Sequence, residues 1–272
     1  MDGSTVRSGR GFAVCLALAV VAAAMGATQA LAQSSPVCVP PPSGMVAWWP
    51  GDGNALDLAG GNNATWLGTV AYTTGEVGQA FSLNGSSYLQ VPSSASLSPT
   101  AAITIDAWIH PTATATSRIV DKITAGGNDG YLLDLYGGKL RLLVDSVGLS
   151  GATTLQANTT YHVAGTFDGT TMTVYVNGSS DGSVPYNGTI PVNALPVRIG
   201  VDSTGAANFF TGWVDEVEIF NRALSQAEIQ SIVSAGPAGK CKGQPIPASS
   251  PVALAALALL ISAAAALALA RR

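Results

Sequence analysis

The chain has 272 residues, enough for one sizeable domain with tails, and a formal net charge of −4. Most of the charge lies in residues 43–236, which hold fifteen acidic and six basic side chains, a net charge of −9. A domain this acidic is poorly suited to nucleic acid or to heparin-like anionic glycans, because both are themselves negatively charged. The composition favours a neutral ligand or a calcium ion.

The first segment, residues 1–32, has the pattern of a secretory signal peptide. Arg7 and Arg10 precede an apolar stretch at residues 12–25, and residues 30–32 (Ala-Leu-Ala) are typical of a cleavage site. A membrane anchor is the alternative, which the shortness of the apolar stretch disfavours. We therefore expect the mature protein to be exported.

Residues 33–43 are predicted to form an extended linker, because four of them are proline. Short segments with alternating apolar and polar residues follow, at the spacing of a β-sandwich. We predict twelve strands, near Val46–Trp49, Thr65–Thr69, Ala80–Leu83, Tyr88–Val91, Ile103–His110, Arg118–Lys122, Tyr131–Tyr136, Lys139–Asp145, Tyr161–Phe167, Met172–Val176, Val197–Gly200 and Gly212–Phe220. The pattern predicts an all-β fold of two packed antiparallel sheets.

Two dipeptides mark hairpin turns between these strands. Asn177-Gly178 separates two predicted strand segments, and Gly137-Gly138 does the same before Lys139. Both supply residues that tolerate the positive φ angles of two-residue hairpin loops.

The last predicted strand runs directly into a helix. Strand alternation places Val214, Glu216 and Glu218 on one face, and Asp215, Val217 and Ile219 on the other. Residues 225–228 (Ser-Gln-Ala-Glu) form a capping-box pattern, and Gly236 is a helix stop. This is the one segment with helical periodicity.

Several motifs occur in the order found in a known family. They lie at residues 46–54, 57, 60–63, 78–85, 103–109, 161–169, 174–178 and 212–225. Together they resemble the laminin G-like jelly rolls of the concanavalin A-like lectin/glucanase superfamily, over roughly residues 46–236. The resemblance implies a jelly-roll sandwich at residues 44–241. It implies no single function, because the superfamily holds lectins, enzymes and adhesion modules.

Calcium is one cofactor that the resemblance implies. Relatives commonly hold it between an early loop acid and late acids, which points to Asp57 and Asp215, with Asp52 and Asn62 as further candidates. Oxygen ligands of this kind suit calcium. The alternative is that these Asp and Asn residues build turns.

A catalytic role would need two carboxylates across a sugar bond. Glu216 and Glu218 are the candidates, but Val214 stands where the superfamily's glucanases carry a third acid. We therefore expect these glutamates to be a strand face or charge partners, and no catalytic residue is assigned. His110 and His162 are expected to be locally hydrogen-bonded strand residues.

Aromatic side chains could stack on sugar rings. Most motif tryptophans alternate within strands and are expected in the core: Trp48, Trp49, Trp108 and Trp213. The polar loop at residues 202–210 lies where relatives bind ligands at one rim of the fold. No residue in this loop identifies a ligand.

Three cysteines are present, and Cys15 leaves with the signal. Cys38 and Cys241 flank the predicted domain. In an exported chain this favours a disulfide between its two ends, which jelly-roll termini are often close enough to form. Two thiols are the alternative.

The C-terminal segment at residues 252–272 is almost wholly apolar and ends in an arginine pair. Its length suits a membrane-crossing helix, and the arginines favour a cytoplasmic end. With the prolines of the preceding linker, residues 242–251, it resembles PEP-CTERM-type sorting signals, although it lacks their glutamate. Both permanent anchoring and cleavage remain open.

The sequence therefore predicts an exported, surface-tethered, non-catalytic binding module for a glycan or for a cell-surface or matrix partner. The alternatives are a glycoside hydrolase or polysaccharide lyase that uses Glu216 and Glu218, and a purely structural envelope protein. No nucleic-acid partner is expected.

Overall fold

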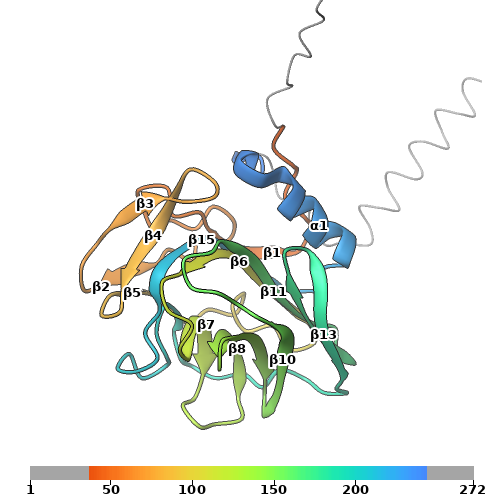
Figure 1. Cartoon of the computed structure of the whole chain (residues 1–272). Helices are drawn as coiled ribbons and strands as arrows, with labels where there is room; N and C mark the ends of the chain where they lie inside the picture. The colour runs from red at the N-terminus through yellow and green to blue at the C-terminus, as the bar shows by residue number, and fades with distance from the viewer. Residues whose placement is uncertain (1–36, 244–272) are drawn as a thin grey trace, which may run out of the picture. The chain divides into compact units, whose positions relative to one another are not determined.

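The computed structural model describes residues 37–243, and these form two antiparallel sheets (Figure 1). One sheet has the spatial order β13 (Ser179–Pro185), β12 (Thr171–Val176), β11 (Tyr161–Phe167), β6 (Ile103–Pro111), β15 (Thr211–Phe220), β4 (Gln79–Asn84) and β3 (Tyr72–Thr74), with β1 (Met45–Trp49) also paired to β15. The other has the order β10 (Val147–Thr154), β9 (Lys139–Val144), β8 (Gly130–Tyr136), β7 (Ser117–Ile123), β14 (Val197–Ile199), β5 (Tyr88–Val91) and β2 (Thr65–Leu67). The predicted all-β jelly-roll class is confirmed.

The core lies between the two sheets and follows from strand alternation. On β6, Ile103, Ile105, Ala107 and Ile109 are fully buried in the main apolar cluster. The seven-stranded sheet contributes a facing set with the same period of two: Leu133, Leu135, Leu140, Leu142 and Val144. The intervening residues of each strand therefore lie on the outer faces of the sandwich.

Both predicted hairpins are present. Asn177 and Gly178 have φ of 50° and 78°, and Val176 pairs directly with Ser179. Gly137 and Gly138 have φ of 58° and 77° in the loop between β8 and β9. Positive φ at both loop residues matches the twist of the flanking strands.

Three strands were not predicted: β3, β10 and β13. In each, small or polar residues replace the apolar alternation, and each lies at or next to a sheet edge. Backbone pairing to a neighbouring strand gives these segments their strand structure. For example, β10 follows β9 and β13 follows β12 through tight turns, and each pairs with the strand before it.

The predicted alternation along β15 is wrong at one point. Pairing with β6 shifts between Asp215 and Glu218, and Glu216 has a φ of +52°, which marks a β-bulge. Val214 consequently joins Val217 in the core cluster, while Glu216 does not share its face. Val214 and Asp215 have therefore exchanged the faces predicted for them.

Helix α1 (Gln226–Ala235) begins at the predicted capping box. The Ser225 hydroxyl accepts from the Glu228 N–H at 3.3 Å, and the Glu228 carboxylate accepts from the Ser225 N–H at 2.9 Å. Leu224, Ile229 and Ile232 then pack on the outer face of the eight-stranded sheet, in a second apolar cluster with Trp48 and other residues. Figure 1 shows α1 beside β1 and β13.

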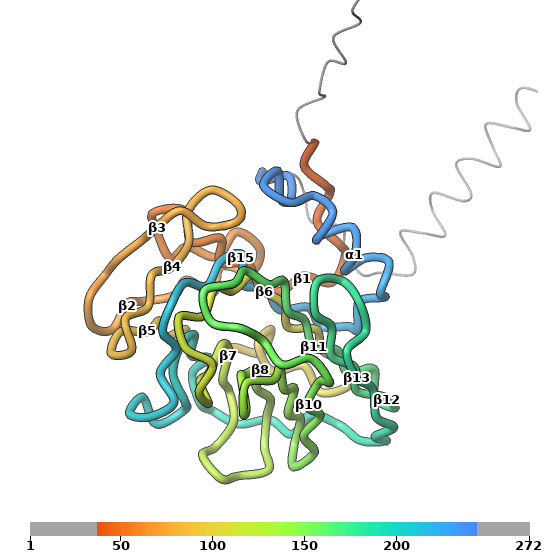
Figure 2. The backbone as a smooth tube through the Cα atoms, in the orientation of Figure 1, coloured from red at the N-terminus to blue at the C-terminus, as the bar shows by residue number. Residues whose placement is uncertain are grey.

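The helix is followed by a short 3-10 turn, η1 (Gly236–Ala238), and by residues 239–243, which we call the C-terminal strap. Val39 and Lys240 form a parallel bridge, and Cys38 and Cys241 form a disulfide with 4.9 Å between their Cα atoms. Figure 2 shows the two ends of the described chain side by side. The predicted disulfide is confirmed.

The predicted signal at residues 1–32 and the segment at residues 252–272 lie outside the described residues. Within residues 37–243, no helix has the length and apolar character needed to cross a bilayer.

Candidate functional site

The predicted calcium residue Asp57 organises a loop. Its carboxylate accepts backbone N–H groups from Trp48 at 2.8 Å, Ala59 at 2.8 Å, Gly60 at 3.0 Å and Asn62 at 2.7 Å. Such donors satisfy both oxygens of a nearly buried carboxylate. These contacts show Asp57 as an acceptor for its own loop and for the end of β1.

The other calcium candidates have partners of their own. Asp52 accepts the Gln79 N–H at 2.9 Å and pairs with Lys242 of the C-terminal strap. Asp215 is fully buried and accepts the Val77 N–H at 2.9 Å. Burial raises the pKa of Asp215 to about 8.

Asn62 joins the Asp57 loop to neighbouring segments. Its amide donates to the Val46 carbonyl at 3.0 Å, and its side-chain oxygen accepts from Ser94 at 2.7 Å. Among residues 37–243, no three His, Cys, Asp or Glu side chains form a group suited to a metal ion. N–H and ammonium donors directed at the candidate carboxylates do not fit a calcium shell, and calcium binding stays a prediction.

Glu216 and Glu218 lie under the C-terminal strap. Lys240 inserts its ammonium between them, 3.1 Å from Glu216 Oε2 and in contact with Glu218 Oε1, and all three side chains are at most 1% exposed. Burial raises the pKa of Glu218, with Lys240 opposing the shift. Burial lowers the pKa of Lys240, but the carboxylates of Glu218 and Glu216 outweigh it, so the pKa is raised.

The same buried cluster holds one of the two histidines. His162 Nε2 lies 3.2 Å from Asp106 Oδ2, and the Trp48 indole donates to Glu216 at 2.9 Å. His110 lies elsewhere, 3.1 Å from the Thr160 hydroxyl. Both histidines therefore have the local strand contacts expected of them. The side chains of Glu216 and Glu218 do not reach the surface in this structure.

An open cleft lies on the outer face of the seven-stranded sheet. It encloses about 310 Å³, and its lining combines polar side chains of β7 and β9 with residues of the loop at 202–210. The polar side chains that matter here are Arg118, Asp121, Arg141, Asp202, Ser203 and Asn208. The loop predicted to lie at a ligand-binding rim therefore does line a cleft.

Charges alternate across the floor of this cleft. Asp134 is fully buried between Arg141, with Nε and Nη2 at 3.0 and 2.7 Å, and Arg118. Arg118 Nε also lies 3.0 Å from Asp121 Oδ2. Strand register creates this row, since Asp134 pairs with both Arg118 and Arg141 on adjacent strands.

The aspartates of the cleft differ in their electrostatics. Burial raises the pKa of Asp121 to about 7, although the Ile123 N–H and Arg118 oppose the shift. Burial also acts to raise the pKa of Asp202, but hydrogen bonds from Thr204 and the Ala206 and Ala207 N–H groups outweigh it and lower the pKa. Asp202 is thus a charged loop anchor, whereas Asp121 titrates near neutral pH.

Two tyrosines on this sheet stack with arginine side chains. The guanidinium carbon of Arg141 lies 3.9 Å from the ring centre of Tyr136, which is 52% exposed. The guanidinium carbon of Arg198 lies 5.6 Å from the ring centre of Tyr88. Planar groups of this kind suit the apolar faces and hydroxyls of a sugar.

The row of Arg118, Asp121, Asp134 and Arg141 was not predicted from the sequence. Its signal was two arginines and two aspartates on three predicted strands, and only the register shows that they meet. The tryptophan expectation holds for Trp48, Trp49 and Trp108, each at most 8% exposed. Trp213 is half-buried and stacks on His110.

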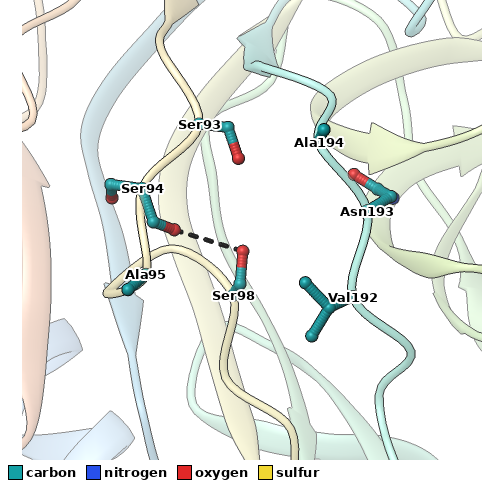
Figure 3. Close-up of a pocket in the computed structure, with 7 residues that line it drawn as sticks. All are labelled: Ser93, Ser94, Ala95, Ser98, Val192, Asn193 and Ala194. Atoms are coloured by element: carbon teal, nitrogen blue, oxygen red, sulfur yellow. Dashed lines mark hydrogen bonds between the residues drawn. The ribbon is translucent and has the colours of Figure 1, made fainter.

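A second hollow of about 500 Å³ is lined by three serines and the segment at residues 192–194 (Figure 3). Beneath it Lys122 is almost fully buried and donates to the Leu195 carbonyl at 2.6 Å, to Asn193, and to Ser93 Oγ at 3.2 Å. Burial lowers the pKa of Lys122. Through these hydrogen bonds, Lys122 connects the loop that contains Ser93 to the segment that contains Asn193 and Leu195.

Similar solved structures were found among binding domains. Domain 4 of AbnA, an extracellular arabinanase from Geobacillus stearothermophilus in complex with arabinotriose, has a TM-score of 0.58 and 20% identity, covering 70% of this chain and 98% of that domain. The binding domain of Paraclostridial Mosquitocidal Protein 1 has a TM-score of 0.58 and 20% identity. The match covers 70% of this chain and 52% of the toxin chain.

The ligand-binding domain of botulinum neurotoxin serotype D, in complex with N-acetylneuraminic acid, has a TM-score of 0.55 and 17% identity, covering 70% of this chain and 50% of that one. The chain thus spans about half of each toxin domain. At these identities the likeness shows the fold. No curated protein matches the sequence.

A family model described as the concanavalin A-like lectin/glucanases superfamily matches residues 83–230. The matched region runs from the end of β4 into α1, and it includes most strands of both sheets and the residues that line the cleft. The chain belongs to the concanavalin A-like lectin/glucanases superfamily.

Proposed function

We propose that the domain is a non-catalytic module that binds a glycan in the cleft of the seven-stranded sheet. The observation that carries the proposal is the row of buried charges on an outer sheet face. Asp121 and Asp134 are at most 1% exposed there, beside arginines that still reach solvent. A face that met only water would not need buried carboxylates, whose desolvation is costly.

The solved relatives support this choice of ligand. The arabinanase domain was solved with arabinotriose and the toxin domain with N-acetylneuraminic acid, so two proteins of this fold are recorded with sugars. The exposed Tyr136 ring beside Arg141 supplies an aromatic platform of the kind that sugars use.

A glycan array with the purified protein tests the proposal. We expect one group of related glycans to bind, and Tyr136→Ala to weaken that binding about tenfold, as the loss of one stacking contact predicts. Val192→Ala, which shortens an exposed apolar side chain at the second hollow, is the matched control. Absence of binding across the array, or equal loss in both variants, contradicts the proposal.

The non-catalytic part rests on the two carboxylate sets. Glu216 and Glu218 are sealed under Lys240, and Asp134 is held by two arginines. A glycosidase needs one protonated and one ionised carboxyl that both reach the substrate. We expect no reducing sugar from laminarin, xylan, agar or alginate. Turnover that disappears in Glu216→Gln would instead establish an enzyme.

Calcium is a separate part of the proposal. An ion at Asp57, Asp215, Asp52 or Asn62 has to displace the donors that now contact these side chains. Support would be a thermal midpoint that rises with calcium chloride, returns with EGTA and no longer responds in Asp57→Asn. A midpoint unchanged by either reagent rejects calcium.

Export and surface tethering complete the proposal. Their support is the sequence pattern of residues 1–32 and 252–272, and the disulfide, since such bonds persist in oxidising compartments. In cells that express the full chain, the domain should be cut by protease added outside, and a chain truncated after residue 243 should appear in the medium. Protection from external protease would contradict both points.

A further inference from the structure

The arginines of this acidic domain are unevenly distributed. Residues 37–243 contain four arginines, and three of them, Arg118, Arg141 and Arg198, lie on the outer face of the seven-stranded sheet. The net charge of −9 over residues 43–236 therefore does not describe the cleft. Arg118 and Arg141 line the cleft itself, where they contact Asp121 and Asp134, and Asp202 lines it from the neighbouring loop.

The carboxylates of the cleft are already occupied. Asp134 accepts from Arg141 and Arg118 through both oxygens. Asp121 contacts the Ile123 N–H at 3.1 Å and Arg118, and Asp202 accepts from its own loop. The aspartates hold the arginines in place and have little acceptor capacity left for a ligand.

The arginines retain unused donors. Within the described part of the chain, Arg118 Nη2 and Arg141 Nη1 have no protein acceptor, and the two side chains are 15% and 17% exposed. The cleft therefore presents unpaired N–H donors, which a ligand with hydrogen-bond acceptors would satisfy. A carboxylate is the acceptor that matches a guanidinium best, because it accepts two parallel, charge-assisted hydrogen bonds.

We infer that the cleft selects sugars carrying a single carboxylate, such as a uronic acid residue in an otherwise neutral glycan. The inference rests on the proposed glycan-binding function. Arg118 and Arg141, which line the cleft, are the specificity-determining residues, and Tyr136, which stacks with Arg141 next to the lining, contacts the sugar ring. Polyanions are disfavoured because the rest of the domain repels them.

The test uses two minimal probes that differ by one group, methyl glucuronide and methyl glucoside, titrated into the isotope-labelled protein and followed by NMR. We expect the arginine Nε–H signals of the cleft to shift with methyl glucuronide at about tenfold lower concentration than with methyl glucoside. Raising the salt concentration should weaken binding of the uronide and leave the glucoside unchanged.

Arg141→Gln should abolish this preference, and Arg141→Lys should reduce it because the forked donor is lost. Lys139→Gln removes the same charge from the same strand at a residue outside the cleft lining, and should keep the preference. The salt dependence of binding is measured on the unmodified protein. It therefore tests the preference for the uronide even if a variant misfolds.

Equal binding of the two probes overturns the selectivity and leaves glycan binding intact. Binding of neither probe also overturns the inference, and the array then decides the proposed function by itself. A preference that persists in Arg141→Gln but is lost in Lys139→Gln would show long-range charge attraction and would likewise overturn the role assigned to Arg141.

Discussion

Buried acids with a raised pKa, such as Asp215 on β15, are expected to make the stability of this domain depend on pH. Asp215 is fully buried, and its pKa of about 8 lies above the usual value of 3.8 because burial disfavours the charged form. A raised folded-state pKa means that the folded protein binds the proton more tightly than the unfolded chain. The contribution is therefore favourable at low pH and is lost as pH rises towards 8.

Asp215→Asn should accordingly stabilise the protein at pH 8 more than at pH 6. The amide keeps an acceptor for the Val77 N–H and removes the ionisation. We expect a gain at pH 8 of at least about 1 kcal/mol, or about 2–4 °C in thermal midpoint. Glu228, whose pKa Arg222 lowers to about 2, stays ionised over this range and adds no slope. Equal effects at both pH values would contradict the assignment.

The hydrogen bonds of Asp57 lead to a second prediction about a single residue. Asp57→Ala removes the acceptor of four backbone N–H groups in a nearly buried loop. We expect a loss of about 2–3 kcal/mol in urea unfolding, the cost of buried donors left unpaired. Asp181→Ala, at a surface acid bonded to Thr153, is the control and should change stability by less than about 0.5 kcal/mol. Similar losses in both variants would count against this role of Asp57.

At the scale of elements, what the sequence could predict depended on periodicity. The apolar alternation of β6 and the capping box of α1 can each be recognised from residues that are close together in the sequence, and both were predicted. Strands β3, β10 and β13 lack that alternation, because edge strands bury little on either face. The bulge at Glu216 was missed because no glycine or turn residue marks its positive φ.

The C-terminal strap is tied to β15 by charge. Lys240→Met leaves Glu218 buried without its cation and Glu216 with Lys242 alone, and we expect a loss of about 3–5 kcal/mol. Adding Glu216→Gln and Glu218→Gln should recover most of it, since neutral side chains remove the uncompensated charge. Urea unfolding at pH 7 measures both. A single variant within about 1 kcal/mol of the parent, or a triple variant no better than the single, would contradict the ion-pair account.

The whole molecule shows why the fold could be predicted and the cleft could not. Family motifs between residues 46 and 236 occur in order along the chain, so the fold followed from their sum. The cleft depends on Arg118, Asp134 and Arg141 meeting across three strands, and on a loop some sixty residues farther along the sequence. Such a meeting is set by register, which the alternation of any one strand leaves undetermined.

The disulfide closes the described chain into a loop, with Cys38 and Cys241 separated by 203 residues. Closing so long a loop restricts the unfolded chain and stabilises the folded one by about 5 kcal/mol in the entropy model. We expect reduction, or Cys38→Ala with Cys241→Ala, to lower the thermal midpoint by about 5–15 °C, given the usual scaling for a domain of this size. Alkylating reagent without reductant is the control and should change nothing, because neither sulfur is a thiol. Two thiols titrated in the unreduced, unfolded protein would rule out the bond. An unchanged midpoint after verified reduction would show that the bond adds no stability beyond the ion pairs of Lys240 and Lys242 in the strap.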